Sequence, residues 1–254
     1  MNNKTKPNWT IQPAGDRSLV IVFESTDPIQ ANQQASAIAR DFQLHKPVGV
    51  DAVVPGMVSV ALHYAPEKVL LAAQAEQATT QWISPYTWLR QQLEQRLQQP
   101  SAEYAVVQRE VEIPVCYGGE HGPDLAEVAQ HCQRSIDEVI GLHTAHDVAV
   151  LMLGFAPGLP YIGRFSEQLS VGRRATPRTV VPAGMVGLAN QQSVIYPVDL
   201  PGGWHLIGRT PLRLFDTGRA EPSLLAAGDR VRFVAITADE FDEITRAQGD
   251  VDEH

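Results

Sequence analysis

The chain has 254 residues, 44% of them hydrophobic and 19% charged, with a formal net charge of −9 at pH 7. This composition is typical of a globular protein and excludes disordered, collagen-like and coiled-coil chains. The acidic balance argues against nucleic-acid binding, and the longest apolar run, 148–157, is too short to span a membrane. Because Cys116 and Cys132 cannot form a disulfide framework and no apolar leader is visible, we expect a cytoplasmic protein with reduced thiols.

The first hundred residues predict a small α+β domain. Apolar runs predict strands, and apolar residues at helical spacing predict helices. In chain order we expect a strand at 19–23, a helix at 29–42, two strands within 48–64 separated by a Pro-Gly turn, and a helix at 84–97. The order β-α-β-β-α favours a ferredoxin-like domain over 1–100, and the polar segment 98–103 is the candidate linker.

A second domain is expected over 106–245. Its predicted elements are an alternating strand at 111–117, a helical stripe at 125–132, a helix opened by the capping box of Ser135 and Glu138, a buried strand at 148–155, and strands at 212–215 and 230–236. Nine glycines and six prolines in the 55 residues from 154 to 208 exclude long helices there. We therefore expect a small closed β-barrel carrying a helical pair, followed by an acidic tail over 246–254.

Several catalytic signatures are absent from the sequence. It contains no G-x-x-x-x-G-K-[ST] phosphate loop, no G-x-S-x-G nucleophile elbow and no H-E-x-x-H or C-x-x-C motif. His143 and His146 could place two metal ligands on one helical face, but no third ligand has a suitable spacing. Because His143 also lies on the apolar stripe, we interpret it as a packing residue and expect no metal site. We expect both cysteines to be inert thiols.

Three Gly/Pro-rich segments, 154–161, 176–184 and 201–211, combine a fixed backbone with side chains that can hold a ligand. Glycine allows the backbone to approach a ligand closely, and proline lowers the ordering cost of binding. The alternative interpretation is that these segments are barrel turns with core aromatic residues. In the first interpretation, flat apolar walls would come from Tyr161, Tyr196 and Trp204.

Positive charge is concentrated in the same part of the chain. Residues 154–219 contain seven arginines and three acidic residues, although the whole chain is acidic. The planar, bidentate donors of arginine suit a carboxylate or phosphate, for which Arg178 and Arg209 are the candidates. The alternative interpretation is that these arginines form surface ion pairs.

Long motifs in this region resemble a known family. GFAPGLPYIG (154–163), ATPRTVVPAG (175–184) and PGGWHLIGRTPLRLFD (201–216) are similar to the allophanate hydrolase subunit 1 family, as are Gln192 and Tyr196-Pro197. YGGEHGPDLAEVAQHC (117–132) and GDRVRF (228–233) match it as well, so that the resemblance covers residues 15–236. It implies a ferredoxin-like N-terminal domain and a cyclophilin-like C-terminal barrel.

The resemblance also implies an activity that needs partners. The family includes the B subunit of ATP-dependent 5-oxoprolinase, which acts with an A subunit and with a C subunit of the allophanate hydrolase subunit 2 type. Together they open 5-oxoproline to glutamate. We therefore expect a component that is inactive alone, with ATP bound in a site shared with a partner protein. The alternatives are a Kip-type inhibitor of a sensor histidine kinase and an accessory protein in urea or allophanate chemistry.

The site residues are hypotheses drawn from the matched motifs. Arg178 and Arg209 would bind the substrate carboxylate or a phosphorylated lactam intermediate, and Gln192 would hydrogen-bond the lactam amide. Asp216 is the candidate catalytic residue, either as a base or to orient an arginine. The full set of candidate substrate-binding residues is Pro157, Gly158, Tyr161, Arg178, Gln192, Tyr196, Trp204 and Arg209.

One segment departs from the family pattern. The family usually reads PAGSVGIAGGQTGIYP where this chain reads PAGMVGLANQQSVIYP (182–197). Met185 therefore removes a hydroxyl, Ser193 replaces threonine, and Asn190, Gln191 and Val194 replace three glycines. We expect the loss of these glycines to stiffen or reshape the loop.

Overall fold

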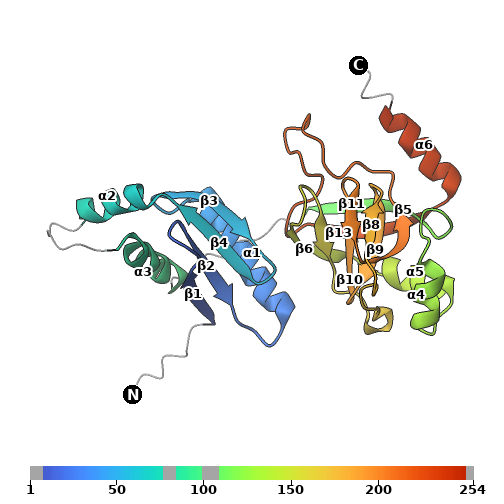
Figure 1. Ribbon diagram of the computed structural model, residues 1–254, viewed down its shortest axis with the longest axis horizontal. Coiled ribbons are helices and arrows are strands. Elements are labelled where there is room, and N and C mark those ends of the chain that lie inside the picture. Colours follow the sequence, from blue (N-terminus) through green and yellow to red (C-terminus); the bar gives the residue numbers. More distant parts are fainter. Residues whose placement is uncertain (1–7, 77–83, 99–108, 250–254) are drawn as a thin grey trace. The chain divides into compact units, whose positions relative to one another are not determined.

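The computed structural model describes residues 8–76, 84–98 and 109–249, and the chain divides into two compact units, 1–107 and 108–254 (Figure 1). Apart from Gln98, the predicted linker at 98–103 lies outside the described residues. Within the described parts of the chain, no helix has both the length and the apolar character needed to cross a membrane.

The N-terminal unit is an antiparallel sheet with three helices. The strand order is β1-β2-β4-β3, and the elements are β1 (Trp9–Pro13), β2 (Ser18–Phe23), α1 (Pro28–Leu44), β3 (Val50–Pro55), β4 (Ser59–Tyr64), α2 (Pro66–Glu76) and α3 (Pro85–Gln98). The predicted strands and helices at 19–23, 29–42, 48–64 and 84–97 are confirmed. The edge strand β1 and the helix α2 are not predicted from the sequence.

The helix α1 has both a capped N-terminus and a buried apolar face, the feature by which the sequence predicts a helix here. Asp27 caps the helix, its carboxylate accepting a hydrogen bond from the Ile29 N–H at 2.9 Å, and Pro28 occupies the first turn. The small residues Ala31, Ala35 and Ala39 share one helix face and are buried, which allows the helix to approach the sheet closely.

The C-terminal unit contains a closed barrel, as the sequence predicts, and this barrel has seven strands. The strand order is β10-β7-β6-β13-β5-β12-β9, and β9 pairs with β10 to close it. The strands are β5 (Glu110–Tyr117), β6 (Val148–Leu153), β7 (Pro160–Ile162), β9 (Met185–Ala189), β10 (Gln192–Ile195), β12 (His205–Arg209) and β13 (Arg230–Ile236). The pair β5–β13 is parallel, and the other pairs are antiparallel.

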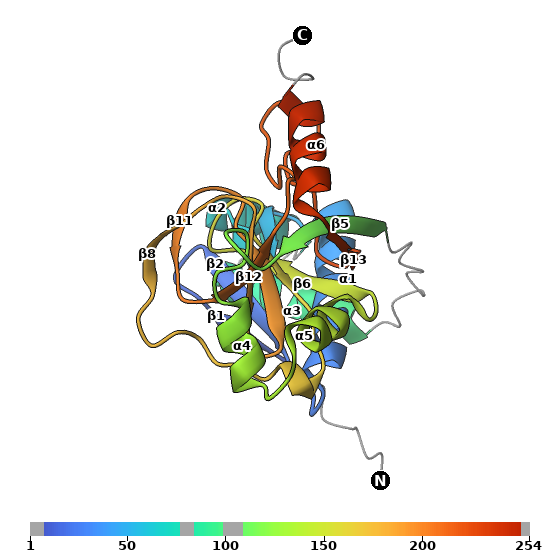
Figure 2. The same ribbon diagram turned by 90° about the vertical axis from the view of Figure 1, so that its right-hand side faces the viewer.

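Helices and a short ribbon accompany the barrel. The helices α4 (Leu125–His131) and α5 (Ile136–Thr144) lie side by side (Figure 2), and α5 begins with the predicted capping box of Ser135 and Glu138. A separate two-stranded ribbon consists of β8 (Arg178–Val181) and β11 (Leu200–Gly202). Between β7 and β8 there is one short 3₁₀ turn, Glu167–Leu169.

Two predicted strands differ from the structure. The strand predicted at 212–215 is wrong: these residues form a loop that buries Leu214, and the one bridge there joins Phe215 to Ser223. The strand predicted at 148–155 ends at Leu153, because Phe155 adopts a left-handed conformation with φ of 71°.

The C-terminal helix is not predicted from the sequence. Helix α6 (Ala238–Gly249) projects from the barrel unit in Figures 1 and 2, so the acidic segment that we expect to begin at 246 starts inside a helix. Its contact with the barrel unit includes the buried side chain of Phe241, whose ring lies 4.5 Å from that of His121.

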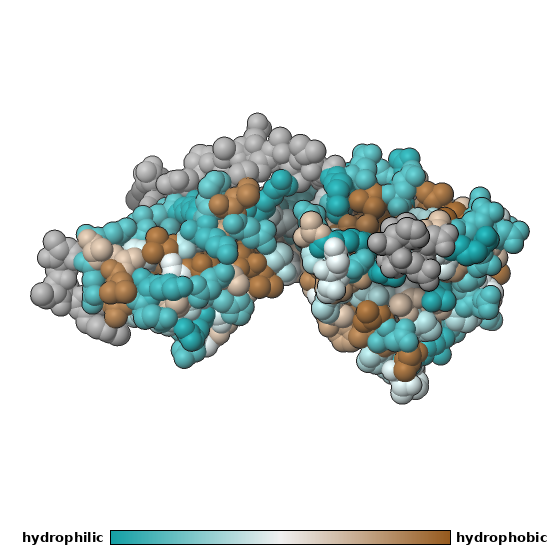
Figure 3. Space-filling model, turned by 90° about the horizontal axis from the view of Figure 1, so that it is seen from above, coloured by the Kyte–Doolittle hydropathy of each residue, from teal (hydrophilic) through white to brown (hydrophobic). Residues whose placement is uncertain are grey.

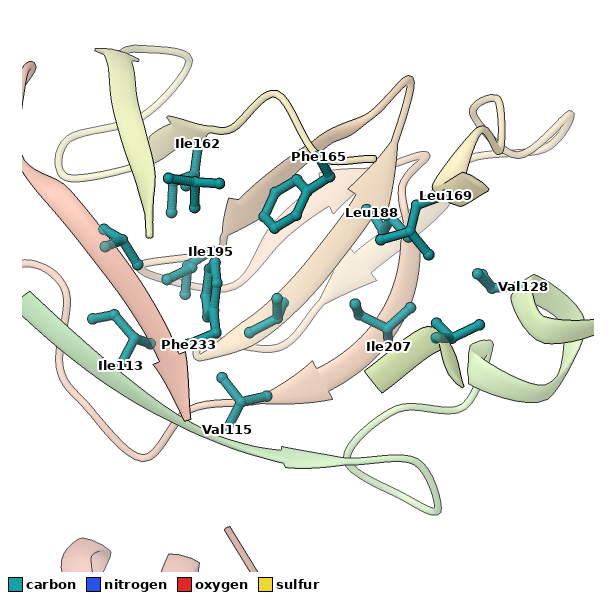
Figure 4. Packing of buried hydrophobic residues seen from close by; sticks show 14 of the residues in the cluster. Ile113, Val115, Val128, Ile162, Phe165, Leu169, Leu188, Ile195, Ile207 and Phe233 are labelled. Atoms are coloured by element: carbon teal, nitrogen blue, oxygen red, sulfur yellow. The ribbon is translucent and has the colours of Figure 1, made fainter. Parts of the chain in front are cut away.

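The barrel core is filled by branched and aromatic side chains from all around the sheet. Figure 4 shows the rings of Phe165 and Phe233 among the aliphatic side chains of Ile113, Ile162 and Ile195. The barrel is therefore a packed core and not an open channel.

The surface formed by the described residues carries no single large apolar face in the view of Figure 3, where apolar patches are separated by hydrophilic ones. The large apolar side chains that remain exposed are distributed over both units.

A polar chain crosses this core. The imidazole of His143 is fully buried, with Nδ1 2.7 Å from the Tyr117 hydroxyl and Nε2 2.8 Å from the Ser193 hydroxyl. Its ring stacks on Phe165 at 4.6 Å and an angle of 8°. Because both nitrogens have neutral partners, the neutral imidazole is satisfied, and burial lowers the pKa of His143 to about 3. His143 is therefore a packing residue, as interpreted from the sequence, and both of its ring nitrogens are hydrogen-bonded.

We expect the buried neutral His143 to make stability depend on pH. Below the ordinary histidine pKa of about 6.5 the unfolded chain binds a proton that the folded chain excludes until about pH 3. The free energy of unfolding should therefore fall by about 1.4 kcal/mol per pH unit across this window. In His143→Gln, which keeps a donor and an acceptor, this part of the slope should vanish. Urea unfolding at pH 7.0 and 4.5 measures it, and an equal slope in wild type and variant would contradict the assignment.

Candidate functional site

Three aromatic residues of the barrel unit meet at a small cavity. Its volume is about 80 Å³, and Tyr161 on β7, Tyr196 after β10 and Trp204 before β12 line it. The rings of Tyr161 and Trp204 meet edge to face, with centroids 6.1 Å apart. The structure thus brings together the three residues for which the sequence predicts flat apolar walls. Phe155 and Arg173, which are not predicted from the sequence, also line the cavity.

Glycines fix the distance between the walls. A Cβ atom at Gly202 would clash with the hydroxyl of Tyr196, and one at Gly187 would lie 2.7 Å from the Cβ of Trp204. Behind the walls, Met185 is buried in the cluster that contains Tyr196 and Trp204. The residue that departs from the family pattern at 185 therefore supplies apolar packing under the cavity.

Tyr196 presents a neutral hydroxyl. Burial raises the pKa of this phenol, against a backbone hydrogen bond with Trp204 and the nearby positive charge of Arg173. A neutral phenol can donate or accept a hydrogen bond but cannot balance the charge of an anion.

A buried carboxylate holds the arginine-rich segment beside the cavity. Asp124 accepts two hydrogen bonds from the guanidinium of Arg178, at 2.7 and 2.9 Å, and one from Arg174 at 3.1 Å. It also accepts the backbone N–H of Leu206 on β12 at 2.7 Å. We call these four residues the Asp124 clamp. The planar donors of Arg178, which we predicted for a ligand anion, are engaged by Asp124.

The clamp shifts the titration of its carboxylate. Burial alone would raise the pKa of Asp124, but the hydrogen bonds from Arg178 and Leu206, with the charges of Arg178 and Arg174, outweigh burial and lower it. Asp124 is therefore ionised at neutral pH and is a permanent partner of both arginines.

The other predicted site residues do not line the cavity. Arg209 donates from Nε to the carbonyl of Ala183 at 3.0 Å. Asp216 lies in a loop, 3.6 Å from Arg213 and 3.7 Å from Arg219, and accepts the N–H of Gly218. The remaining three are Pro157, which is exposed, Gly158, which packs against Phe215, and Gln192, which begins β10.

Asn190 and Gln191 form the turn between β9 and β10, with φ of 50° and 60°. Both are in the left-handed region that glycine adopts most easily, as expected for a two-residue hairpin of type I′. The side-chain amide oxygen of Gln191 accepts a hydrogen bond from Arg164 Nε at 3.4 Å. The substitution of the family's glycines therefore leaves a tight hairpin here, at a conformational cost on the order of 1 kcal/mol for Gln191.

Metal ligands are not gathered at this site. Among residues 8–76, 84–98 and 109–249, no three His, Cys, Asp or Glu side chains lie close enough to bind one metal ion. Cys116 is buried and unpaired, and burial raises the pKa of its thiol.

Comparison with known proteins identifies a family. The family model for the carboxyltransferase domain, subdomain C and D, matches residues 9–225. The B subunit of 5-oxoprolinase from Bacillus subtilis (strain 168) is 40% identical over 92% of this chain and 95% of the relative. The B subunit of 5-oxoprolinase from Escherichia coli O157:H7 is 56% identical over 50% of this chain and 58% of the relative.

A solved structure has a similar fold and sequence. The crystal structure of TTHA0988 superposes with a TM-score of 0.71 and 32% sequence identity, over 87% of this chain. This chain spans 40% of the length of the TTHA0988 chain.

We expect Asp124→Asn to lower the free energy of unfolding of the barrel unit by about 2–3 kcal/mol at pH 7, because Arg174 and Arg178 lose a charged partner. Because folding lowers the pKa of Asp124, this contribution is complete above the ordinary aspartate pKa of about 3.9. It is lost as the pH falls through the lowered value.

Urea unfolding at pH 7 and at pH 3 measures this contribution. The matched control is Glu167→Gln, which removes an exposed pair with Arg164 at 3.9 Å and should change stability by no more than about 0.5 kcal/mol. A similarly small effect of Asp124→Asn at pH 7 would show that solvent screens the clamp.

Proposed function

The chain belongs to the carboxyltransferase domain, subdomain C and D, family, and on this premise we propose that it is the B subunit of an ATP-dependent 5-oxoprolinase. In this proposal it acts in the cytoplasm with subunits of types A and C to convert 5-oxoproline to glutamate, and it is inactive alone. The observation that carries the proposal is the 40% identity to the B subunit of a 5-oxoprolinase across nearly the full length of both chains.

We infer family folds for both units. In the N-terminal sheet, β2, β4 and β3 with α1 supply the β-α-β-β part of a ferredoxin-like domain, and the N-terminal strand β1 occupies the edge beside β2. The closed barrel with its helical pair supports a cyclophilin-like assignment for the C-terminal unit.

The aromatic cavity suits one small ring. Tyr161 and Trp204 offer apolar faces against which the five-membered ring of 5-oxoproline could pack, and Tyr196 offers a neutral hydroxyl beside them. We propose that this cavity binds the lactam. The Asp124 clamp would position the segment next to it, and Arg178 would act through that clamp.

Neither the aromatic cavity nor a larger cavity in the N-terminal unit suits ATP. The aromatic cavity, about 80 Å³, is well below the roughly 300 Å³ at which drug-sized ligand sites begin. A larger cavity of about 350 Å³ in the N-terminal unit is lined by apolar and amide side chains, among them Trp9, Gln30 and Gln34, with no basic residue for a phosphate. We therefore propose that ATP binds in a site completed by a partner protein.

We expect the purified chain to show no 5-oxoproline-dependent ATP hydrolysis. Addition of the A and C subunits of a 5-oxoprolinase should produce ATP hydrolysis coupled to glutamate formation, because in this proposal a partner completes the nucleotide site. Release of phosphate and of glutamate are measured for the chain alone, for each pair and for the complete set.

Three outcomes would contradict this proposal in different ways. Turnover by the chain alone would refute the shared site. No 5-oxoproline turnover by the complete set, but turnover of allophanate or urea, would favour the alternative accessory role. Inhibition of a sensor histidine kinase by the chain, with no turnover in any mixture, would favour a Kip-type inhibitor.

A further inference from the structure

Arg173 differs from the other arginines around the aromatic cavity. Arg174 and Arg178 hydrogen-bond to Asp124, and Arg209 donates to a backbone carbonyl. Within the described parts of the chain, Arg173 has no carboxylate or carbonyl oxygen at hydrogen-bond distance. Its side chain lines the cavity, and its guanidinium carbon lies 5.2 Å from the centroid of the Trp204 ring.

A cation–π contact uses none of the N–H donors of a guanidinium in a hydrogen bond. The guanidinium carbon of Arg173 lies over the Trp204 ring, 5.2 Å from its centroid, and this contact leaves the five N–H donors of the side chain available. An arginine held in this way can still bind a carboxylate through two parallel hydrogen bonds.

The backbone that carries Arg173 is fixed before any ligand binds. The N–H of Arg174 donates to the carbonyl of Gly203 at 2.7 Å, which ties the segment to the residue before Trp204. The side chains of Arg174 and Arg178 hold the same segment to Asp124. Such preorganisation lowers the entropy lost when a ligand is bound.

The charge of the cavity selects one kind of ligand. Of its lining residues Arg173 is the one with a formal charge, and the rest are aromatic, aliphatic, proline or glycine. One cation beside flat apolar walls in a volume of about 80 Å³ suits a small monoanion with a compact ring, and it does not suit a nucleotide.

We propose that Arg173 binds the carboxylate of 5-oxoproline while the lactam ring packs in the cavity against Tyr161 and Trp204. This assignment rests on the proposed function for the identity of the ligand. The inference of a carboxylate site itself rests on the cavity, on the guanidinium of Arg173 over the Trp204 ring, and on the hydrogen bond that fixes the backbone at Arg174.

Binding to the full-length chain tests the site directly. The probes are L-5-oxoproline and 2-pyrrolidinone, which has the same lactam ring without the carboxylate, and affinity is measured by calorimetry. We expect wild type to bind 2-pyrrolidinone at least tenfold more weakly than 5-oxoproline. Arg173→Gln should reduce 5-oxoproline affinity at least tenfold and leave that for 2-pyrrolidinone unchanged. Arg173→Lys should fall between, because lysine keeps the charge but loses the planar donors.

The matched control is Arg164→Gln, an exposed arginine outside the cavity, which should bind both probes as wild type does. Thermal melts of the Arg173 variants should match wild type, because Arg173 forms no ion pair with any residue that the structure describes. Absence of 5-oxoproline binding by wild type, or an affinity of Arg173→Gln within twofold of wild type, would overturn the proposal.

Activity of the reconstituted enzyme separates this proposal from the function. If wild type turns over 5-oxoproline and Arg173→Gln has the same KM, the carboxylate assignment fails and the function stands. A KM raised at least tenfold, with kcat nearly unchanged, supports both. If the complete set is inactive but the chain binds the carboxylate through Arg173, the function fails and the site stands.

Discussion

The Asp124 clamp is the interaction on which the geometry of the barrel unit's cavity depends. The carboxylate of Asp124, immediately before α4, accepts a hydrogen bond from the backbone of β12. It also accepts hydrogen bonds from Arg178, the first residue of β8, and from Arg174, which precedes this strand. Two segments about 50 and 80 residues away along the chain are thereby fixed to one point. These contacts also position Trp204 and Arg173 in the cavity. Trp204 is two residues from Leu206, and Arg173 is next to Arg174, and both Leu206 and Arg174 hydrogen-bond to Asp124.

The arrangement also explains how a basic segment can serve two purposes. A buried carboxylate requires paired cations, and Arg174 and Arg178 meet this need, so their charge is already compensated. Arg173 is exposed, and its guanidinium carbon lies over the Trp204 ring, a contact that needs no negatively charged partner. These arginines, which are close in sequence, therefore differ in their availability to a ligand. Arg174 and Arg178 fix the segment beside the cavity, and Arg173 is available to bind an anion.

Local signals made much of the fold predictable. The capping box of Ser135 and Glu138 and the alternation of β5 depend on neighbouring residues, and both are confirmed. The strand predicted at 212–215 is wrong because Leu214 is buried although the residues around it form a loop, so its apolar character does not indicate a strand. At the site, the sequence indicates the aromatic residues through their Gly/Pro-rich surroundings. It could not rank Arg173 above Arg178, because the partner that distinguishes them, Asp124, is about 50 residues away.

The departures from the family pattern lie in two places: Met185 and Val194 are in the cluster of the aromatic walls, and Asn190 and Gln191 form the turn between β9 and β10. Met185 adds apolar packing behind Tyr196, whereas Asn190 and Gln191 keep a left-handed turn without glycine. The larger side chain of Met185 changes the packing of the aromatic residues in the same cluster. The β9–β10 turn keeps its left-handed conformation, so the pairing register of these two strands is that of a two-residue hairpin. Because Val194 lines the cavity where the family has glycine, it narrows a space that is already small. A small and largely apolar cavity offers a ligand few polar contacts, so the one charged side chain that lines it, Arg173, is the group that can orient an anion there.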